Sequence, residues 1–207
     1  MNTATVPSLD DRIGLRAPLL FACVSLLGFG LAYSLIGTVL SGIAFPHQAT
    51  GSIVERDGRA VGSSLIAQPF VDARYFQPRP SAAKYDPMAA AGSNQARSNP
   101  DLRKRLAEET AAIAAREGIA LSEVPPELAT QSGGGLDPQI SPRSAQVQAA
   151  RVARARGIDP AQVDALIAQH TQPPQYGVLG EPRVNVLALN LALDAQQRQH
   201  LDTRTRR

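Results

Sequence analysis

The feature that most constrains this chain is a long uncharged stretch near its amino terminus. No charged side chain lies between Arg16 and Glu55, and residues 19–45 are almost all apolar or small. A helix of that length measures about 40 Å at roughly 1.5 Å per residue, more than the hydrocarbon core of a bilayer, about 30 Å. The run therefore predicts one tilted transmembrane helix. No second apolar stretch approaches the roughly 18 residues that a span needs, so this chain alone cannot build a channel bundle.

The length of the apolar run also distinguishes an anchor from a signal peptide. A secretory signal has an apolar core of about 7 to 15 residues, and this run is nearly twice as long, which favours an uncleaved anchor. Arg16 lies close to the run, Arg56 lies further from its other end, and long domains cross the membrane largely regardless of charge. We expect a single-pass protein of the plasma (inner) membrane, with residues 1–18 in the cytoplasm, residues 19–45 in the bilayer and the rest outside.

Small residues recur along the expected span. Their spacing of four, three and four residues puts them on one helical face, where small side chains let a second helix approach closely. Gly and Ser are also common in membrane helices, so chance remains an alternative. We expect this face to pack on a membrane partner; it consists of Gly30, Ser34, Gly37 and Ser41.

The charge distribution argues against binding of nucleic acid. The net charge is +3, but residues 46–197 carry equal numbers of basic and acidic side chains, and the excess lies in residues 198–207. We expect a frayed basic tail there, and no charged stripe that could track phosphates. The single cysteine, Cys23, lies in the expected span, which excludes an intramolecular disulfide and a thiolate metal site.

The region after the span is long enough for one core of ordinary size, and its pattern favours an α+β fold. We expect one mixed α/β extracytoplasmic domain over residues 46–197. Its first part, residues 52–68, has short β-prone runs around Asp57-Gly58, which predicts a hairpin. The proline-rich segment, residues 68–87, follows the hairpin and predicts an ordered, irregular loop. Its aromatic residues should hold this loop; they are Phe70, Tyr75, Phe76 and Tyr85.

Three helices are predicted from capping residues and stop signals. The first begins at Asn99-Pro100 and ends at Gly118; the second runs from Ser141-Pro142 to Gly157. The third opens at Asp159-Pro160 and ends near His170. Apolar positions should bury one face of the first two helices; they are Leu102, Leu106 and Ile113, then Val147 and Val152.

The last element carries two conflicting periods. Leu187, Leu189, Leu191 and Leu193 alternate as in a strand, whereas Asn185 could cap a helix with Val186 and Leu189 on one face. We expect a short strand near Val184 that runs into a helix.

Signatures of stand-alone catalysis are absent from the sequence. No Gly precedes a Lys, so there is no GxxxxGK[ST] loop, and neither HExxH nor GxSxG occurs. The three histidines, His47, His170 and His200, are far apart in sequence and are expected at surfaces or in loops. Nothing here predicts an enzyme or a metal site.

One glycine-rich segment, residues 130–138, could contribute to binding. Consecutive glycines allow backbone amides to converge on an anion, because no Cβ obstructs the approach. A phosphate is one interpretation of this segment. A structural turn before the helix at Pro142 explains the same glycines equally well, because no Lys is nearby and no long helix follows immediately.

Several segments together resemble the C subunit family of the potassium-transporting ATPase, the Kdp complex. The resemblance extends from the expected span nearly to the carboxyl end, and the joint order of RPSA, SNP, SGGGLDPQISP and GEPRVNVL is highly specific. Two departures concern Asp86, where the family usually has Asn, and the loose segment at residues 91–100. The segments are GSSLIAQPF (62–70), YFQPRPSAAKYD (75–86), GSNQARSNPDL (92–102), VPPELATQSGGGLDPQISPRSAQVQAARVARARG (124–157) and GEPRVNVLALNLALD (180–194).

The resemblance implies an accessory, non-catalytic subunit of an ATP-driven potassium importer. The family's partners are a channel-like A subunit, which contains the ion path, and a P-type B subunit, which hydrolyses ATP. The family is described as a catalytic chaperone that raises the ATP affinity of the B subunit, with nucleotide contacts at a glycine-containing signature. By position, the residues implied to contact ATP are Ser132, Gly133 and Gly134.

The expected topology conflicts with a direct ATP contact. A domain outside the membrane cannot share a nucleotide with a cytoplasmic ATPase, so any effect on ATP affinity should be allosteric. We expect the main role to be assembly and stabilisation, with the outer domain over the external mouth of the A subunit. The alternatives are a membrane-anchored outer-face enzyme and a secreted binding protein with a long signal.

Overall fold

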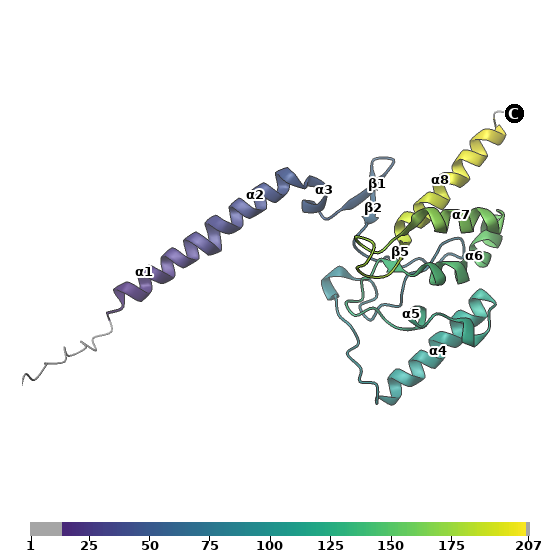
Figure 1. Cartoon of the computed structure of the whole chain (residues 1–207), viewed down its shortest axis with the longest axis horizontal. Helices are drawn as coiled ribbons and strands as arrows, with labels where there is room; N and C mark the ends of the chain where they lie inside the picture. The colour runs from purple at the N-terminus through teal and green to yellow at the C-terminus, as the bar shows by residue number, and fades with distance from the viewer. Residues whose placement is uncertain (1–13, 206–207) are drawn as a thin grey trace, which may run out of the picture. The chain divides into compact units, whose positions relative to one another are not determined.

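The computed structural model describes residues 14–205 of the chain, which form two compact units (Figure 1). The first unit ends at Gly51 and the second begins at Ser52. Most of the expected cytoplasmic segment 1–18, including Arg12, lies outside the described residues. The α+β fold class is confirmed: one apolar helix is followed by a region of mixed helices and short strands.

The first unit is a continuous helical rod with one short helix after it. The rod runs from Arg16 to Ala44, three residues earlier at its start than the expected span, and has a mean hydropathy of 2.2. None of its side chains is buried, so in water its apolar surface would be hydrated at high cost. It is the one helix among residues 14–205 with the length and composition of a membrane span. Its parts are α1 (Arg16–Ser25), a π-helix η1 (Leu26–Tyr33) and α2 (Ser34–Ala44), followed by α3 (Pro46–Ala49).

The π-helix changes the face of small residues expected in the span. Gly30 lies in η1, whereas Ser34, Gly37 and Ser41 lie in α2. A π-helix bonds residue i to i+5, so its turn is wider than that of an α-helix. Gly30 is therefore rotated away from the position that a uniform α-helix predicts, and the other three residues keep the α-helical spacing.

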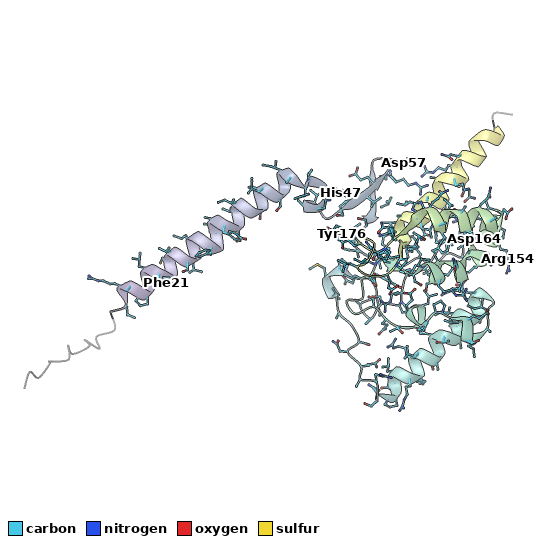
Figure 2. All side chains as sticks on the ribbon, viewed as in Figure 1. Phe21, His47, Asp57, Arg154, Asp164 and Tyr176 are labelled. Carbon is cyan, nitrogen blue, oxygen red and sulfur yellow. The ribbon has the colours of Figure 1, made fainter. Side chains whose placement is uncertain are left out.

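The second unit begins with the predicted hairpin. β1 (Ile53–Arg56) pairs antiparallel with β2 (Arg59–Ser63), and the pairing shifts register between Val54 and Glu55. Asp57 and Gly58 have φ values of 53° and 72°, as a two-residue hairpin turn of type I′ requires. The hairpin prediction is confirmed, and Figure 2 shows Asp57 at its tip.

The three predicted helices are present, with the expected caps. At each start a side-chain oxygen accepts a backbone N–H of the first turn, and a proline follows; the caps are Asn99, Ser141 and Asp159. Gly118 and Gly157 end the first two helices in the left-handed conformation. The helices are α4 (Pro100–Glu117), α6 (Pro142–Arg156) and α7 (Pro160–His170), and the short helices of this unit are η2 (Pro87–Ala89), η3 (Leu121–Glu123) and α5 (Pro126–Ala129).

A small antiparallel sheet connects these helices to the last one. Its strand order is β3 (Gln139–Ile140), β5 (Arg183–Asn185) and β4 (Thr171–Gln172). β5 runs directly into α8 (Val186–Thr205). Asn185 Oδ1 accepts the Ala188 N–H at 3.0 Å, so the predicted strand near Val184 and the predicted cap are both confirmed.

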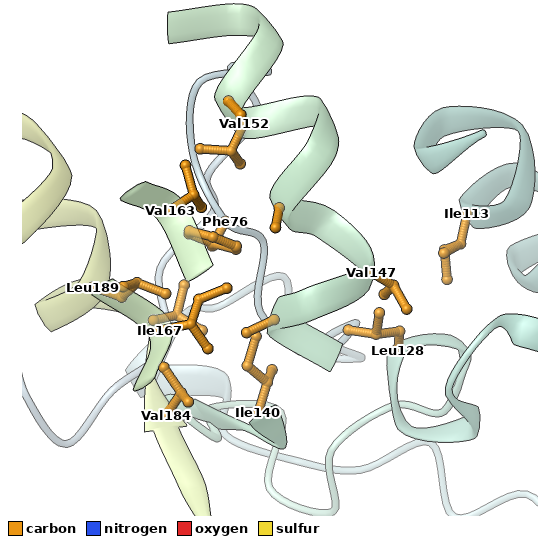
Figure 3. Packing of buried hydrophobic residues seen from close by; sticks show 14 of the residues in the cluster. Phe76, Ile113, Leu128, Ile140, Val147, Val152, Val163, Ile167, Val184 and Leu189 are labelled. Atoms are coloured by element: carbon orange, nitrogen blue, oxygen red, sulfur yellow. The ribbon is translucent and has the colours of Figure 1, made fainter. Parts of the chain in front are cut away.

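One hydrophobic cluster forms the core of the second unit (Figure 3). α6 contributes Val147 and Val152, and α7 packs against both α6 and α8. Phe76, from the proline-rich segment, is fully buried in this cluster. Ile113 of α4 is buried as expected, but Leu102 and Leu106 are only half-buried, because the first half of α4 projects beyond the core.

The carboxyl-terminal segment differs from the expected frayed tail. α8 continues to Thr205, so residues 198–205 are helical. Arg198 donates to Asp57 Oδ2 at 2.9 Å, which ties this part of the helix to the hairpin turn. The composition of the segment concealed this continuity, because charged residues are compatible with an exposed helix as well as with a tail.

Candidate functional site

The proline-rich segment lies on the core without pairing as a strand. Asn190 Oδ1 accepts the Phe76 N–H at 2.8 Å, and Asn190 Nδ2 donates to the Phe76 carbonyl at 3.0 Å. In the same way, Gln148 Oε1 accepts the Gln77 N–H at 2.8 Å, and Gln148 Nε2 donates to the Gln77 carbonyl at 3.1 Å. Two buried side-chain amides thus replace the partner strand, which explains how an irregular segment stays ordered.

Two arginines bind the backbone just before this point. Arg151 Nη1 donates to the carbonyls of Ala73 and Tyr75 at 2.6 and 3.0 Å, and its Nε contacts the buried carboxylate of Glu117 at 2.9 Å. Arg156 Nε donates to the Arg74 carbonyl at 2.7 Å. These contacts set the course of the segment that continues to Pro80 and Ser81.

The glycine segment, residues 130–138, packs against the proline-rich segment at Pro80 and Ser81. The Ser132 N–H donates to the Pro80 carbonyl at 3.1 Å, and the Ser132 side chain is buried. The Ser132 hydroxyl accepts the Asp137 N–H at 3.4 Å, and the Gly135 N–H donates back to the Ser132 carbonyl at 3.2 Å. These bonds make residues 132–137 a closed turn, in agreement with the structural interpretation of the glycines.

The glycines of this turn fall into two kinds. Gly135 has a φ of +73°, and a Cβ there would lie 2.9 Å from the Ala91 carbonyl oxygen and 3.0 Å from the Ala83 Cβ. Gly133 and Gly134 are exposed, and a Cβ on either would meet open space. Gly135 is therefore required by packing and backbone conformation, whereas packing does not require Gly133 or Gly134.

Phosphate binding by this segment would depend on few groups. The Gly133 and Gly134 amides form no hydrogen bond with another described residue and could donate to an anion. The Ser132 amide is occupied by the Pro80 carbonyl, and its buried hydroxyl already accepts the Asp137 N–H. Arg79, a cation that contacts this segment, is paired with Asp137 at 3.3 Å and also donates to the Gln131 carbonyl. The next long helix begins only at Pro142, so these residues do not fit a triphosphate held by this chain alone.

A cavity of about 510 Å³ lies beside the same loop. Pro80 and Ser81 line it, and the glycine segment contacts both. Its other walls are apolar residues of α4, α5 and the proline-rich segment, with Lys84 and Arg116 as cations and Glu109 as an acid. Ser132, Gly133 and Gly134 are not among the lining residues, so the glycine segment and the cavity are neighbours and do not form one site.

Two non-glycine residues beside the cavity have strained backbones. Lys84 and Tyr85 have φ values of 53° and 62°, an uncommon conformation for residues with a side chain. The Tyr85 N–H donates to Ser81 Oγ, and its hydroxyl donates to the Arg79 carbonyl, each at 3.0 Å. Burial, with a smaller effect of nearby Glu109, raises the pKa of Tyr85. Tyr85 is therefore a neutral hydrogen-bonded residue that holds the loop.

A second ionic cluster, in addition to that of Glu117, lies between α6, α8 and the hairpin. Asp194 accepts from Arg156 at 2.8 Å, from Arg56 at 2.7 Å and from the Tyr75 hydroxyl at 3.2 Å. Burial disfavours the carboxylate, but the hydrogen bonds from Arg56 and Arg156 outweigh it and hold the pKa of Asp194 below its usual 3.8. Every group is paired, which is typical of a structural cluster.

Among the side chains that the structure describes, residues 14–199, no cluster of metal-ligating groups occurs. His47 lies in α3 and His170 at the end of α7, in different units. The side chain of His200 lies outside the described residues. Asp86, at the position of the family departure, accepts the Met88 N–H at 2.9 Å, a role that an Asn oxygen can also fill.

The residues that organise this region were missed from sequence. Asn190 lies within the leucine-rich run of α8, and Gln148 lies between Val147 and Ala149 of α6. A polar side chain in an apolar stripe is the signal that could have identified them, because a buried amide needs partners. The identity of those partners depends on a segment more than 70 residues away in the chain.

Comparison with known proteins agrees with these features. The family model described as KdpC, the K+-transporting ATPase c chain, matches residues 15–195. The potassium-transporting ATPase KdpC subunit of Xanthomonas oryzae is 60% identical over 192 residues, 93% of this chain and 91% of the relative. The subunit of the same name from Xanthomonas axonopodis is 62% identical over 91% of this chain and 92% of its own length, and that from Shewanella putrefaciens is 52% identical over 88% and 89%. The chain belongs to the KdpC family, the c chains of the K+-transporting ATPases.

Proposed function

We propose that this protein is an accessory, non-catalytic subunit of an ATP-driven potassium import complex. The observation that carries the proposal is one fully exposed apolar helix, with the length of a membrane span, followed in the chain by a separate compact unit. Family membership supports the same assignment, because the relatives are named as subunits of a potassium-transporting ATPase. The channel-like A subunit and the P-type B subunit are the proposed partners.

The proposed orientation places the second unit on the extracytoplasmic side of the plasma membrane. The support is the position of Arg16 at the start of the apolar helix, which favours a cytoplasmic amino terminus. In this orientation the second unit and the site of ATP hydrolysis lie on opposite sides of the bilayer.

The effect on ATP affinity that family resemblance implies is then allosteric. It requires about 1 to 3 kcal/mol of coupling between the two sides of the membrane. Direct contact through Ser132, Gly133 and Gly134 is the competing proposal. The two free amides of Gly133 and Gly134 favour it, and the bonds that occupy Ser132 count against it. We therefore propose that the chain acts on ATP affinity through the partner subunits.

The proposed attachment in the membrane uses the small residues of α2. Ser34, Gly37 and Ser41 share a face with α-helical spacing, and Gly30 precedes them in the π-helix. Small residues allow close packing of a second helix, which in lipid is driven by van der Waals contact. We propose that this face packs on the A subunit.

Two measurements test the proposal. The tagged full-length chain, expressed with the other subunits, should co-purify from detergent with two larger membrane chains and should have no hydrolase activity alone. In sealed right-side-out vesicles, protease added outside should degrade the second unit and leave the first helix protected. Purification without partners would contradict the assembly role. Protection of the second unit in such vesicles would contradict the orientation and reopen direct contact with ATP.

A further inference from the structure

A tight turn at residues 175–179 projects apolar side chains into solvent. The backbones of Gln175 and Leu179 bond to each other in both directions, at 2.8 and 2.9 Å. Tyr176 and Gly177 have φ values of 54° and 78°, and the Val178 N–H closes the turn on the Gln175 carbonyl at 3.3 Å. The turn is thus preformed, and Figure 2 shows Tyr176 at the edge of the second unit.

The exposure of this turn is unusual for its composition. Tyr176, Val178 and Leu179 are 84%, 80% and 57% exposed. Other exposed apolar residues of the second unit, such as Val71, Met88 and Leu121, stand apart from one another in sequence. A tyrosine at positive φ is uncommon, and here no burial of its ring compensates. Residues 176–179 therefore combine hydrated apolar side chains with a strained backbone at Tyr176, and both features cost free energy.

Charged groups without partners flank the turn. A cavity of about 690 Å³ is lined by Gln175 and Leu179 of the turn and by residues at the start of α6 and before β5. Arg143, Glu181 and Arg183 line it, and none of the three forms an ion pair with another described residue. Two further carboxylates, Glu127 and Asp137, lie in the same wall. An apolar projection therefore stands next to a hollow of mixed charge.

We propose that this turn, together with the flanking hollow, docks on the extracytoplasmic face of another folded subunit of the same complex. The inference rests on the proposed function. The complementary surface would offer an apolar socket for Tyr176 and Val178, and acidic and basic groups at its rim for Arg143 and Glu181. Rigid aromatic anchors surrounded by a polar rim are the usual anatomy of a protein interface.

The charges favour a protein over a lipid surface as the occupant. Membrane-binding surfaces combine apolar side chains with Lys and Arg, which attract the phosphates of headgroups. Here the charges of the hollow are mixed: Glu127 and Glu181 lie beside Arg143 and Arg183, and the remaining carboxylate, Asp137, is paired with Arg79. A folded protein can hold complementary charges of both signs at fixed positions, whereas the headgroups of a fluid lipid layer have no fixed arrangement.

Photocrosslinking in the assembled complex tests the proposal directly. A benzoylphenylalanine at position 178 of the full chain, co-expressed with the other subunits, should crosslink to one larger subunit. The matched control carries the same group at position 71, where the native Val71 is 88% exposed. We expect at least about a tenfold higher yield at position 178. Equal yields at the two positions, or crosslinks from position 178 only to lipid or to a second copy of this chain, would overturn the proposal.

A triple variant provides a second measurement. Tyr176→Ser, Val178→Ser and Leu179→Ser together should speed the exchange of tagged for untagged subunit in the purified complex at least about tenfold. The control is Val71→Ser, Met88→Ser and Leu121→Ser, which removes comparable exposed apolar surface and should leave exchange unchanged. An unchanged rate in the first variant would refute the docking turn. Failure of the wild-type chain to co-purify at all would instead refute the proposed function.

Discussion

Asn190 pairs with both backbone polar groups of Phe76, so that one side-chain amide does what a neighbouring strand does elsewhere. The pair connects the middle of α8 to the proline-rich segment and lies where both residues are fully buried. Because Phe76 is also a member of the hydrophobic core, the same contact fixes the depth at which its ring packs.

Replacement of Asn190 should therefore destabilise the second unit. Asn190→Leu leaves the Phe76 N–H and carbonyl buried without partners, at a cost of about 2 to 4 kcal/mol in the free energy of unfolding. Urea denaturation of the full chain in detergent, followed by far-ultraviolet circular dichroism, measures it. Gln146→Leu, an exposed position on α6, is the control and should change stability by less than about 0.5 kcal/mol. Similar losses for the two variants would contradict this account.

Acid should weaken the cluster around Asp194. Because its pKa is lowered in the folded state, its contribution is complete above the unfolded-state value near 3.8 and is lost as the pH falls below it. At pH 7, Asp194→Asn should cost about 1 to 3 kcal/mol, because it leaves the nearly buried Arg156 without its carboxylate. The difference from wild type should shrink as the pH falls through 3.8 toward the lowered pKa of Asp194 in the folded state. The control is Asp164→Asn, an exposed position of α7; a difference that stays constant with pH would be evidence against the pairing.

Two neighbouring glycines should respond differently to alanine. Gly135→Ala forces a side chain into the left-handed region and against Ala91 and Ala83, so we expect a loss of about 1 to 3 kcal/mol. Gly134→Ala, in open space, should be nearly neutral. The same denaturation assay compares them, and equal effects would show that the turn does not depend on Gly135.

Bulk on the small face of the apolar helix should release the subunit. Gly30→Leu, Ser34→Leu, Gly37→Leu and Ser41→Leu together should reduce the share of this chain that co-purifies with the larger subunits at least about tenfold, because close helix packing is blocked. Ala32→Leu with Val39→Leu, on the other side of the helix, is the control and should co-purify normally. Full and stable assembly of the fourfold variant would rule out this face as the contact.

Local chemistry explains how much of the fold was predictable. Asn99, Asp159 and Gly118 act within one turn of their own helices, so the ends of α4 and the start of α7 follow from the sequence. The three-stranded sheet does not, since β3 has only two residues and its partner lies beyond two helices. The π-helix of residues 26–33 also has no local signal such as a proline.

The candidate site was predictable only in part, for a related reason. The glycines of residues 133–135 are visible in the sequence, but their separate roles depend on Ala83, Ala91 and Pro80, which come from a distant segment. The exposure of Tyr176 likewise cannot be predicted locally, because it depends on whether a distant segment of the chain packs over the turn. Non-local contacts, or their absence, decide both cases.

The two ion pairs between the hairpin and α8 have a mechanical consequence. Arg56 binds Asp194 and Arg198 binds Asp57, so the first element of the second unit is fastened to its last helix. A pull on the chain at Ser52 is thus shared with α8, and through Asn190 with the buried Phe76, before any single strand is loaded alone. A force applied at Ser52 therefore acts on the first and last elements of the second unit together.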